Sequence, residues 1–345
     1  MKIMDNLLRS NIKKLQAYSS SRDEFTKQAE VYLDANENPF NNGINRYPDP
    51  YQNKLKERVS ELKNIAKEKL FFGNGSDEVL DLTIRTFCEP GRDNVIICPP
   101  TYAMYKVLAD INDIKVKEVI LNNDFSLNTN KIISVVDENT KLLILCSPNN
   151  PTGNSINKSD LELLLSKLNC IVLVDEAYID FSNKESALDL IDKYPNLIIS
   201  QTLSKAWGMA GIRVGMAFTS TKIAEILNKV KPPFNINTLS QQKAFEGLKN
   251  KSLYFDILNM IHTQKKLLIQ KLKEFNNVEE VYPSDANFLL VKFTNSKFIF
   301  EKLQKKGIIV RDRSKQVLCE NCLRITIGTE KENNKLIIKL KEIEK

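Results

Sequence analysis

Short apolar runs alternate with longer amphipathic stretches along much of this sequence. Between residues 70 and 220 the apolar runs occupy 94–98, 141–146, 171–174, 197–200 and 214–218. Segments between them, such as 158–168, have a helical pattern. Strands that are apolar at every position are buried on both faces, as in a parallel sheet covered by helices. The pattern therefore predicts an α/β fold built on a large, mostly parallel sheet.

The C-terminal part of the sequence predicts a second, smaller unit. Two consecutive prolines, Pro232 and Pro233, interrupt the pattern, and residues 238–274 have the pattern of a long helix with an interruption near Asn250. A terminal helix is expected from about residue 331, and the strand candidates before it are 287–292, 308–311 and 323–326. We therefore predict an N-terminal arm (1–40), a large domain (41–235) and a small C-terminal α/β domain with the linking helix (236–345).

Composition and charge exclude several classes of protein. The 345 residues carry 50 Lys+Arg and 43 Asp+Glu, and the excess of +7 is spread over lysines. This distribution lacks the arginine-rich or aromatic-interleaved patch of a nucleic-acid-binding protein. No apolar run approaches the roughly 20 residues of a membrane span, and the first residues contain no apolar signal region. We expect a cytoplasmic protein that contacts neither membranes nor nucleic acid.

Metal chemistry is not expected either. The single histidine, His262, excludes zinc sites built on several histidines. Cys319 and Cys322 have the spacing of metal and redox sites, but a lone pair of cysteines cannot close a tetrahedral zinc site. All six cysteines are expected to be reduced thiols, and no metal is predicted.

Polar and aromatic residues follow four consecutive predicted strands. The segments after the strands are 99–102 (PPTY), 147–153 (SPNNPTG), 175–178 (DEAY) and 202–205 (TLSK). In open α/β sheets, ligands bind beyond the carboxyl ends of the strands. The four segments therefore predict a binding site at this edge of the sheet.

The residue types at this edge indicate the chemistry. Lys205, placed after a strand among small residues, is suited to be a Schiff-base nucleophile. Asp175 ends a buried strand and needs a positive partner, such as a protonated pyridine nitrogen. The turn 72–77 leads into a helix, whose free amides can bind an anion together with Thr202, Ser204 and Arg213. Together these residues predict a pyridoxal phosphate pocket.

Each of these residues also has a plainer interpretation. Lys205 could lie on a surface turn, Asp175 could cap a helix, and residues 75–77 could be a helix start without phosphate. Tyr47 could serve only to pack the turn that Pro48 and Pro50 impose.

The ordered motifs resemble a known family. GNGSD (73–77), PTY (100–102), NNPTG (149–153), DEAY (175–178) and LSKAWGMAGIR (203–213) resemble the fold-type I pyridoxal-phosphate aminotransferases. The outer motifs resemble more narrowly the histidinol-phosphate aminotransferases: LDANENP (33–39), RYPD (46–49), ANF (286–288), VRD (310–312) and CLRITIG (322–328). The resemblance covers residues 31 to 330, and it implies a large domain that binds the cofactor and a smaller α/β domain.

The resemblance implies a role for each matching cofactor residue. Lys205 would hold pyridoxal 5'-phosphate as a Schiff base, Asp175 would keep its ring nitrogen protonated, and Tyr102 would stack on the ring. The phenolate oxygen would accept hydrogen bonds from Tyr178 and Asn150, and the Asn150–Pro151 peptide would be cis. The phosphate would be held by Ser76, Asp77, Thr202, Ser204 and Arg213.

On the substrate side, the resemblance implies two arginines and two residues of the N-terminal part. Arg324 would bind the carboxylate of the amino-acid partner, and Arg311 the phosphate of histidinol phosphate. Arg313 lies close by in sequence, and one of the two could be a solvated charge at the rim; Arg311 is preferred for the phosphate. Tyr47 would reach the cofactor phosphate of a neighbouring subunit, which implies a homodimer, and Asn36 and Tyr47 would contact substrate.

The resemblance therefore implies a reversible amino transfer between histidinol phosphate and 2-oxoglutarate, with glutamate as the other amino compound, in histidine biosynthesis. An aromatic amino-acid aminotransferase and a threonine-phosphate decarboxylase on the same fold are the alternatives. A regulatory protein that keeps the fold without turnover is a third, which intact Lys205, Asp175 and Arg213 argue against.

Overall fold

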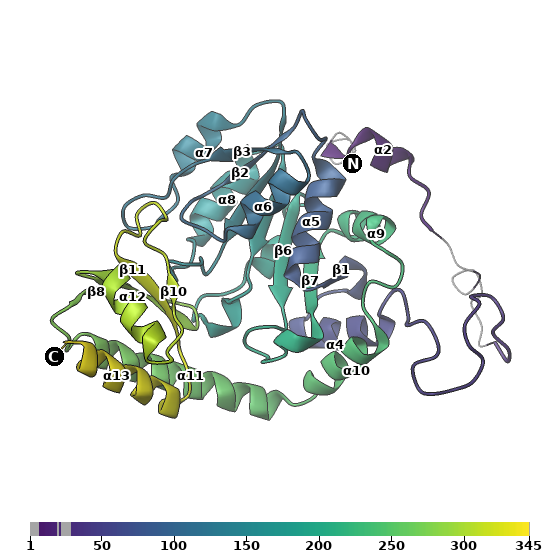
Figure 1. Ribbon diagram of the computed structural model, residues 1–345. Coiled ribbons are helices and arrows are strands. Elements are labelled where there is room, and N and C mark those ends of the chain that lie inside the picture. Colours follow the sequence, from purple (N-terminus) through teal and green to yellow (C-terminus); the bar gives the residue numbers. More distant parts are fainter. Residues whose placement is uncertain (1–6, 19–20, 22–28, 345) are drawn as a thin grey trace.

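The computed structural model describes residues 7–18, 21 and 29–344 and divides the strands between two sheets (Figure 1). The predicted arm (1–40) therefore lies partly outside the described residues. The strands of the large sheet are β1 (Leu70–Asn74), β2 (Asn94–Ile97), β3 (Lys115–Glu118), β4 (Thr140–Cys146), β5 (Ile171–Asp175), β6 (Leu197–Thr202) and β7 (Val214–Thr219). Those of the small sheet are β8 (Val278–Val281), β9 (Phe288–Phe293), β10 (Arg311–Asp312) and β11 (Cys322–Thr326).

The large sheet is mostly parallel, as predicted. Its strand order is β1-β7-β6-β5-β4-β2-β3, and β7 runs antiparallel to both of its neighbours. The apolar runs of the sequence form the five strands from β7 to β2 in this order. The pattern did not reveal the two edge strands, because β3 (KVKE) has no buried residue and β1 ends in a glycine turn.

Helices cover both faces of this sheet. Alternate residues of each strand face opposite sides, so that Leu142 and Leu173 pack in one core and Leu143 and Val172 in the other. The first core contains helices α5 (Ser76–Phe87), α6 (Met104–Ile111) and α9 (Thr221–Val230). The second contains α4 (Asn53–Lys63), α7 (Thr129–Val135), α8 (Lys158–Lys167) and α10 (Thr238–Gly247). Short helical segments are α2 (Ser10–Lys14), η1 (Lys67–Lys69), η2 (Ile179–Phe181), η3 (Ala187–Leu190) and η4 (Ala210–Ile212).

The small sheet is antiparallel, in the order β10-β11-β9-β8, and helices cover one of its faces (Figure 1). These helices are α11 (Lys251–Leu272), α12 (Ser296–Lys305) and α13 (Glu330–Glu344). Asn250 separates α10 from α11 and caps α11 by accepting a hydrogen bond from the Leu253 amide, which confirms the predicted interruption. Within the described residues, no helix combines the length and apolar character needed to cross a membrane.

One strand prediction is wrong in extent. The segment 308–311 was expected to be a strand, but pairing with β11 is limited to Arg311 and Asp312. Ile308 and Val310 instead belong to a loop and pack against the core between the small sheet and its helices, the helix-side core. Their apolar character reflects this burial rather than strand pairing.

Candidate active site

A pocket lies at the carboxyl ends of β4, β5 and β6, beside the start of α5. Apart from Tyr47, every residue that the sequence predicted around the cofactor ring and phosphate lines it, and Cys146 and Ala177 complete the lining. The Asn150–Pro151 peptide that brings Asn150 to the pocket is cis, as predicted. The full set of lining residues is Ser76, Asp77, Tyr102, Cys146, Asn150, Asp175, Ala177, Tyr178, Thr202, Ser204, Lys205 and Arg213.

Asp175 is the last residue of β5 and keeps only 3% of its surface exposed. Its Oδ2 accepts a hydrogen bond of 2.7 Å from the Tyr105 hydroxyl, and its Oδ1 accepts one of 3.1 Å from the Ala177 amide. Within the described residues, no lysine or arginine makes an ion pair with this carboxyl. Burial therefore raises the pKa of Asp175 to about 6, although both hydrogen bonds oppose the rise. A cationic group of a ligand would offset the free-energy cost of ionising this buried carboxyl.

Tyr105 is a site residue that the sequence analysis missed. It lies on α6, is completely buried, and meets the Tyr102 ring edge-on at a centroid distance of 5.5 Å. A buried tyrosine needs a partner for its hydroxyl, and Asp175 is that partner. The spacing of three residues from Tyr102 was the available signal, because it places both side chains on one face of a helical turn.

Lys205 follows β6 in a tight turn and is exposed toward the pocket. Its Nζ lies 5.6 Å from the centroid of the Tyr178 ring. Surrounding protein atoms desolvate the ammonium and, together with repulsion from Arg324, lower the pKa of Lys205, while Asp175 opposes the shift. Lys205 is therefore neutral more often than a solvated lysine, as a nucleophile or base must be.

The start of α5 forms the anion-binding end of the pocket. Gly75 precedes the helix with a φ of +78°, and a Cβ there would lie 2.4 Å from Nη2 of Arg213. A Cβ on Gly215 would lie 2.3 Å from the Ser76 nitrogen, so β7 can approach the helix start this closely only because position 215 is a glycine. The first amides of α5 have no partner within the helix, and Arg213 Nη1 lies 3.5 Å from Ser204 Oγ beside them. This arrangement suits a phosphate.

The Asp77 side chain supports its neighbours. One carboxylate oxygen accepts a hydrogen bond of 3.3 Å from the Tyr102 hydroxyl, and the other lies 3.8 Å from Arg213 Nη2. A carboxylate repels a phosphate, so Asp77 offers an anion its backbone amide and orients Tyr102 and Arg213 with its side chain.

Arg324 brings the small sheet to the pocket. Its Nη1 donates a hydrogen bond of 2.5 Å to Asn150 Oδ1, and Asn150 Nδ2 in turn donates to the Tyr178 hydroxyl at 3.4 Å. The guanidinium lies over the Phe288 ring, 5.3 Å from its centroid. Arg324 alternates along β11 with Leu323 and Ile325, which face the helix-side core. Arg311, by contrast, is exposed on β10 and does not line the pocket.

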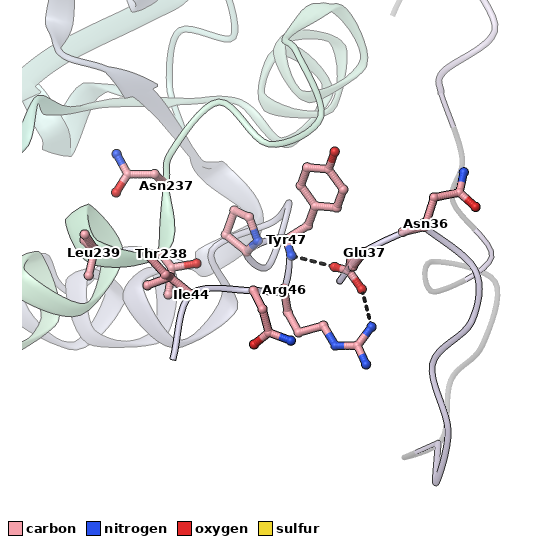
Figure 2. Close-up of a pocket in the computed structure, with 11 residues that line it drawn as sticks. Asn36, Glu37, Ile44, Arg46, Tyr47, Asn237, Thr238 and Leu239 are labelled. Carbon is pink, nitrogen blue, oxygen red and sulfur yellow. Dashed lines mark hydrogen bonds and ion pairs between the residues drawn. The ribbon is translucent and has the colours of Figure 1, made fainter. Parts of the chain in front are cut away.

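Asn36 and Tyr47 lie in a different pocket, beside the start of α10 (Figure 2). The Tyr47 amide donates to Glu37 Oε1 at 2.6 Å, and Arg46 Nη1 lies 2.7 Å from Glu37 Oε2. The Tyr47 ring stacks on Phe234 at a centroid distance of 4.5 Å and stays 51% exposed. Within one chain, therefore, these residues are not brought together with Lys205. The sequence analysis also missed Glu37, whose side chain is only 3% exposed and fixes the turn at Tyr47.

Comparisons with known proteins show the family to which the chain belongs. The family model "Aminotransferase class I and II" matches residues 15–340. A histidinol-phosphate aminotransferase of Flavobacterium psychrophilum is 54% identical over 342 residues, which are 99% of both chains. The solved histidinol-phosphate aminotransferase of Clostridium acetobutylicum superimposes with a TM-score of 0.80 at 27% identity, over 87% of this chain and 91% of the other. That of Sinorhizobium meliloti, in complex with pyridoxal-5'-phosphate, has a TM-score of 0.80 at 20% identity, over 87% and 83%. The predicted fold is thereby confirmed, and the chain belongs to the class I and II aminotransferase family.

Proposed function

We propose that this chain is a pyridoxal-phosphate-dependent histidinol-phosphate aminotransferase, with glutamate and 2-oxoglutarate as the second amino donor and acceptor. One observation carries the proposal. A chain that is 54% identical over nearly its whole length to a relative of that name gathers Lys205, Asp175 and the start of α5 in one pocket.

The pocket residues fit pyridoxal 5'-phosphate. Asp175 is a buried carboxyl without a cationic partner among the described residues, and a protonated pyridine nitrogen supplies one. The glycine-lined start of α5 and Arg213 suit the phosphate. Lys205 is a lysine of lowered pKa on the pocket side, where it can bond to the aldehyde carbon. When bound, the group supplies an electron sink for the bond broken at the substrate's α-carbon.

In this proposal, one residue transfers a proton and another keeps a proton in place. Lys205, as a neutral amine, would take the proton from the substrate's α-carbon. Asp175, ionised at neutral pH because its pKa is about 6, keeps a proton on the ring nitrogen. Tyr178 and Asn150, joined by their 3.4 Å hydrogen bond, would hold the phenolate oxygen of the cofactor, and Tyr102 would pack against its ring.

Arg324 is proposed to bind the carboxylate of glutamate, because it is the arginine that contacts the pocket residue Asn150. The planar guanidinium fork suits a carboxylate. Arg311 remains the candidate for the substrate phosphate that the resemblance indicated, with its position at the outer edge of the small sheet.

The active form is proposed to be a homodimer in the cytoplasm. Residues before α4 carry large apolar side chains with little cover, including Leu33 at 87% exposure and Phe40 at 81%. Apolar surface of this kind is typical of an interface. A second subunit would also give Tyr47 and Asn36 a site to contact, since neither lines the pocket of its own chain.

The proposal is tested by steady-state assay of the purified protein with histidinol phosphate, phenylalanine and threonine phosphate. We expect kcat/KM for histidinol phosphate to exceed that for phenylalanine by about a hundredfold or more, because an uncharged side chain leaves the arginine proposed for the phosphate without its anion. Lys205→Ala should abolish turnover, whereas Lys167→Ala, on the exposed face of α8, should not change it.

Three results would contradict the proposal. A preference for phenylalanine would indicate an aromatic aminotransferase, and release of carbon dioxide from threonine phosphate a decarboxylase. No turnover of any substrate by protein that binds the cofactor would favour the regulatory alternative.

A further inference from the structure

Glu37 is a buried carboxylate in an exposed segment. The residues around it, 31–34, 36 and 38–44, are exposed, but the Glu37 side chain is only 3% exposed. Burying a carboxylate costs free energy unless hydrogen bonds and a counter-charge replace the lost water. Apolar packing therefore does not explain why a glutamate is buried here, and its partners indicate what it does.

Both oxygens of the Glu37 carboxylate hold the chain at Tyr47 (Figure 2). Oε1 accepts a hydrogen bond of 2.6 Å from the Tyr47 amide, and Oε2 accepts one of 2.7 Å from Arg46 Nη1. A third bond, of 2.9 Å from Asn45 Nδ2 to the Asn38 carbonyl, closes the same loop. Two positions ten residues apart are thereby fixed to each other, so the path of the backbone into Tyr47 depends on Glu37.

The ring of Tyr47 and the turn after it are held by other residues. The ring stacks on Phe234 at a centroid distance of 4.5 Å. Lys231, which is 6% exposed, donates from Nζ to the Pro50 and Pro233 carbonyls at 2.8 Å each, and so joins the turn after Tyr47 to the segment before Phe234. The large domain thus fixes the ring and the following turn, which leaves the preceding backbone to the carboxylate.

The hydroxyl of Tyr47 is directed away from these supports. Within the described residues it has no hydrogen-bond partner, and the residue is 51% exposed. Figure 2 shows the ring pointing away from Glu37 and Arg46. A phenol that is fixed at its backbone and along its ring, but presents its hydroxyl outward, is organised in advance to bind a group outside its own chain.

We propose that Glu37 is a positioning residue for the pocket of the neighbouring subunit: it sets the position of Tyr47, whose hydroxyl binds the cofactor phosphate there. The inference rests on the proposed function, since it needs a homodimer in which Tyr47 reaches that phosphate. Glu37 itself touches no part of the cofactor. Its loss leaves the Tyr47 amide without its acceptor and lets the ring move out of reach of the phosphate.

The test measures how tightly the apo-protein binds pyridoxal 5'-phosphate and pyridoxal, which differ only in the phosphate. In Glu37→Ala the dissociation constant for pyridoxal 5'-phosphate should rise by about fivefold to twentyfold, while that for pyridoxal stays within about twofold. Glu37→Gln keeps an oxygen for the Tyr47 amide and should recover part of the loss. Glu61→Ala is the matched control, because Glu61 is an exposed glutamate that also pairs with an arginine, Arg58, and it should change neither constant.

A second substitution separates positioning from folding. In Tyr47→Phe the dissociation constant for pyridoxal 5'-phosphate should rise by about tenfold, and adding Glu37→Ala should raise it by less than about twofold more, because both changes act through one hydroxyl. An effect of Glu37→Ala that is undiminished beside Tyr47→Phe, or is equal for pyridoxal, would overturn the inference and leave the proposed function in place. Parental affinity in Tyr47→Phe would overturn the role of Tyr47 in the proposed function and the inference with it.

Mixed dimers show in which subunit Glu37 acts. A dimer of one Glu37→Ala subunit and one Lys205→Ala subunit has one pocket with Lys205, and the Tyr47 that reaches this pocket comes from the chain with intact Glu37. At a pyridoxal 5'-phosphate concentration that leaves Glu37→Ala dimers mostly empty, this pocket should turn over histidinol phosphate at the parental rate. A rate as low as that of Glu37→Ala dimers would mean that Glu37 acts on the pocket of its own chain, and would overturn the inference.

Discussion

The large sheet and the small sheet each form one wall of the site, and the two walls differ in how their charged groups are paired. The wall from the large sheet holds its carboxylates in place within the chain: Tyr105 donates to Asp175, which has no cationic partner among the described residues, and Asp77 lies beside Arg213. On the side of the small sheet, Arg324 reaches the pocket residue Asn150. Among the described residues, neither its buried Nε nor that of Arg313 has a hydrogen-bond partner. The first wall is thus organised before any ligand arrives, as a permanently bound cofactor requires, whereas the second leaves its donors for substrates that come and go.

The largest effect is expected on the organised wall. Asp175→Asn should lower kcat on the order of a thousandfold, because a neutral amide cannot hold the ring nitrogen protonated while a proton is removed from the α-carbon. The shape of the pocket should persist, so the variant should still bind pyridoxal phosphate, which absorbance of the purified protein measures. Asp110→Asn, on the exposed side of α6, is the control. Turnover within a few-fold of the parent would show that Asp175 is only a structural strand end.

On the small-sheet wall, the expected losses depend on the substrate. Arg324→Ala should lower kcat/KM for glutamate by about tenfold to a hundredfold and change that for histidinol phosphate much less, because only glutamate has a carboxylate. Arg311→Ala should have the reverse preference with a smaller effect, since its guanidinium is exposed and screened. Separate assay of the two half-reactions measures both. Equal losses for both substrates in both variants would indicate one shared anion site and remove the division between the arginines.

The two walls also differ in how far the sequence predicted them. Lys205 and Asp175 could be placed because each follows an apolar run, and the carboxyl ends of parallel strands meet at one edge. Tyr105 was missed although its spacing from Tyr102 was a signal, because an aromatic residue within an amphipathic helical pattern resembles an ordinary core residue unless its hydroxyl is known to meet Asp175.

The depth of an arginine is likewise invisible in the sequence. Residues 311 and 313 are two apart on an extended segment and therefore share a face, so residue type and spacing are the same for both. Only the folded structure shows that Arg313 is half-buried whereas Arg311 is exposed. The roles proposed for Tyr47 and Asn36 could not be derived from the fold of one chain, because they depend on contacts with a second chain.

The smallest effect, a shift in pH dependence, tests whether the organised wall depends on its internal hydrogen bonds. The Tyr105 hydroxyl donates to the ionised form of Asp175 and so lowers a pKa that burial has raised to about 6. In Tyr105→Phe this pKa should rise further, by about one unit.

The bound ring nitrogen needs the carboxylate form of Asp175, so the affinity of the apo-protein for pyridoxal phosphate falls as the pH drops through this pKa. The fall should begin at a higher pH in the variant, with near-equal affinities at pH ~8 and a difference of about threefold to tenfold at pH ~6. Fluorescence titration of the apo-protein across this range measures the affinity. Tyr282→Phe, which removes a hydroxyl that interacts with Glu280 and does not line the pocket, is the control. A lower melting temperature with an unchanged pH profile would mean that Tyr105 serves only to pack α6 against the sheet.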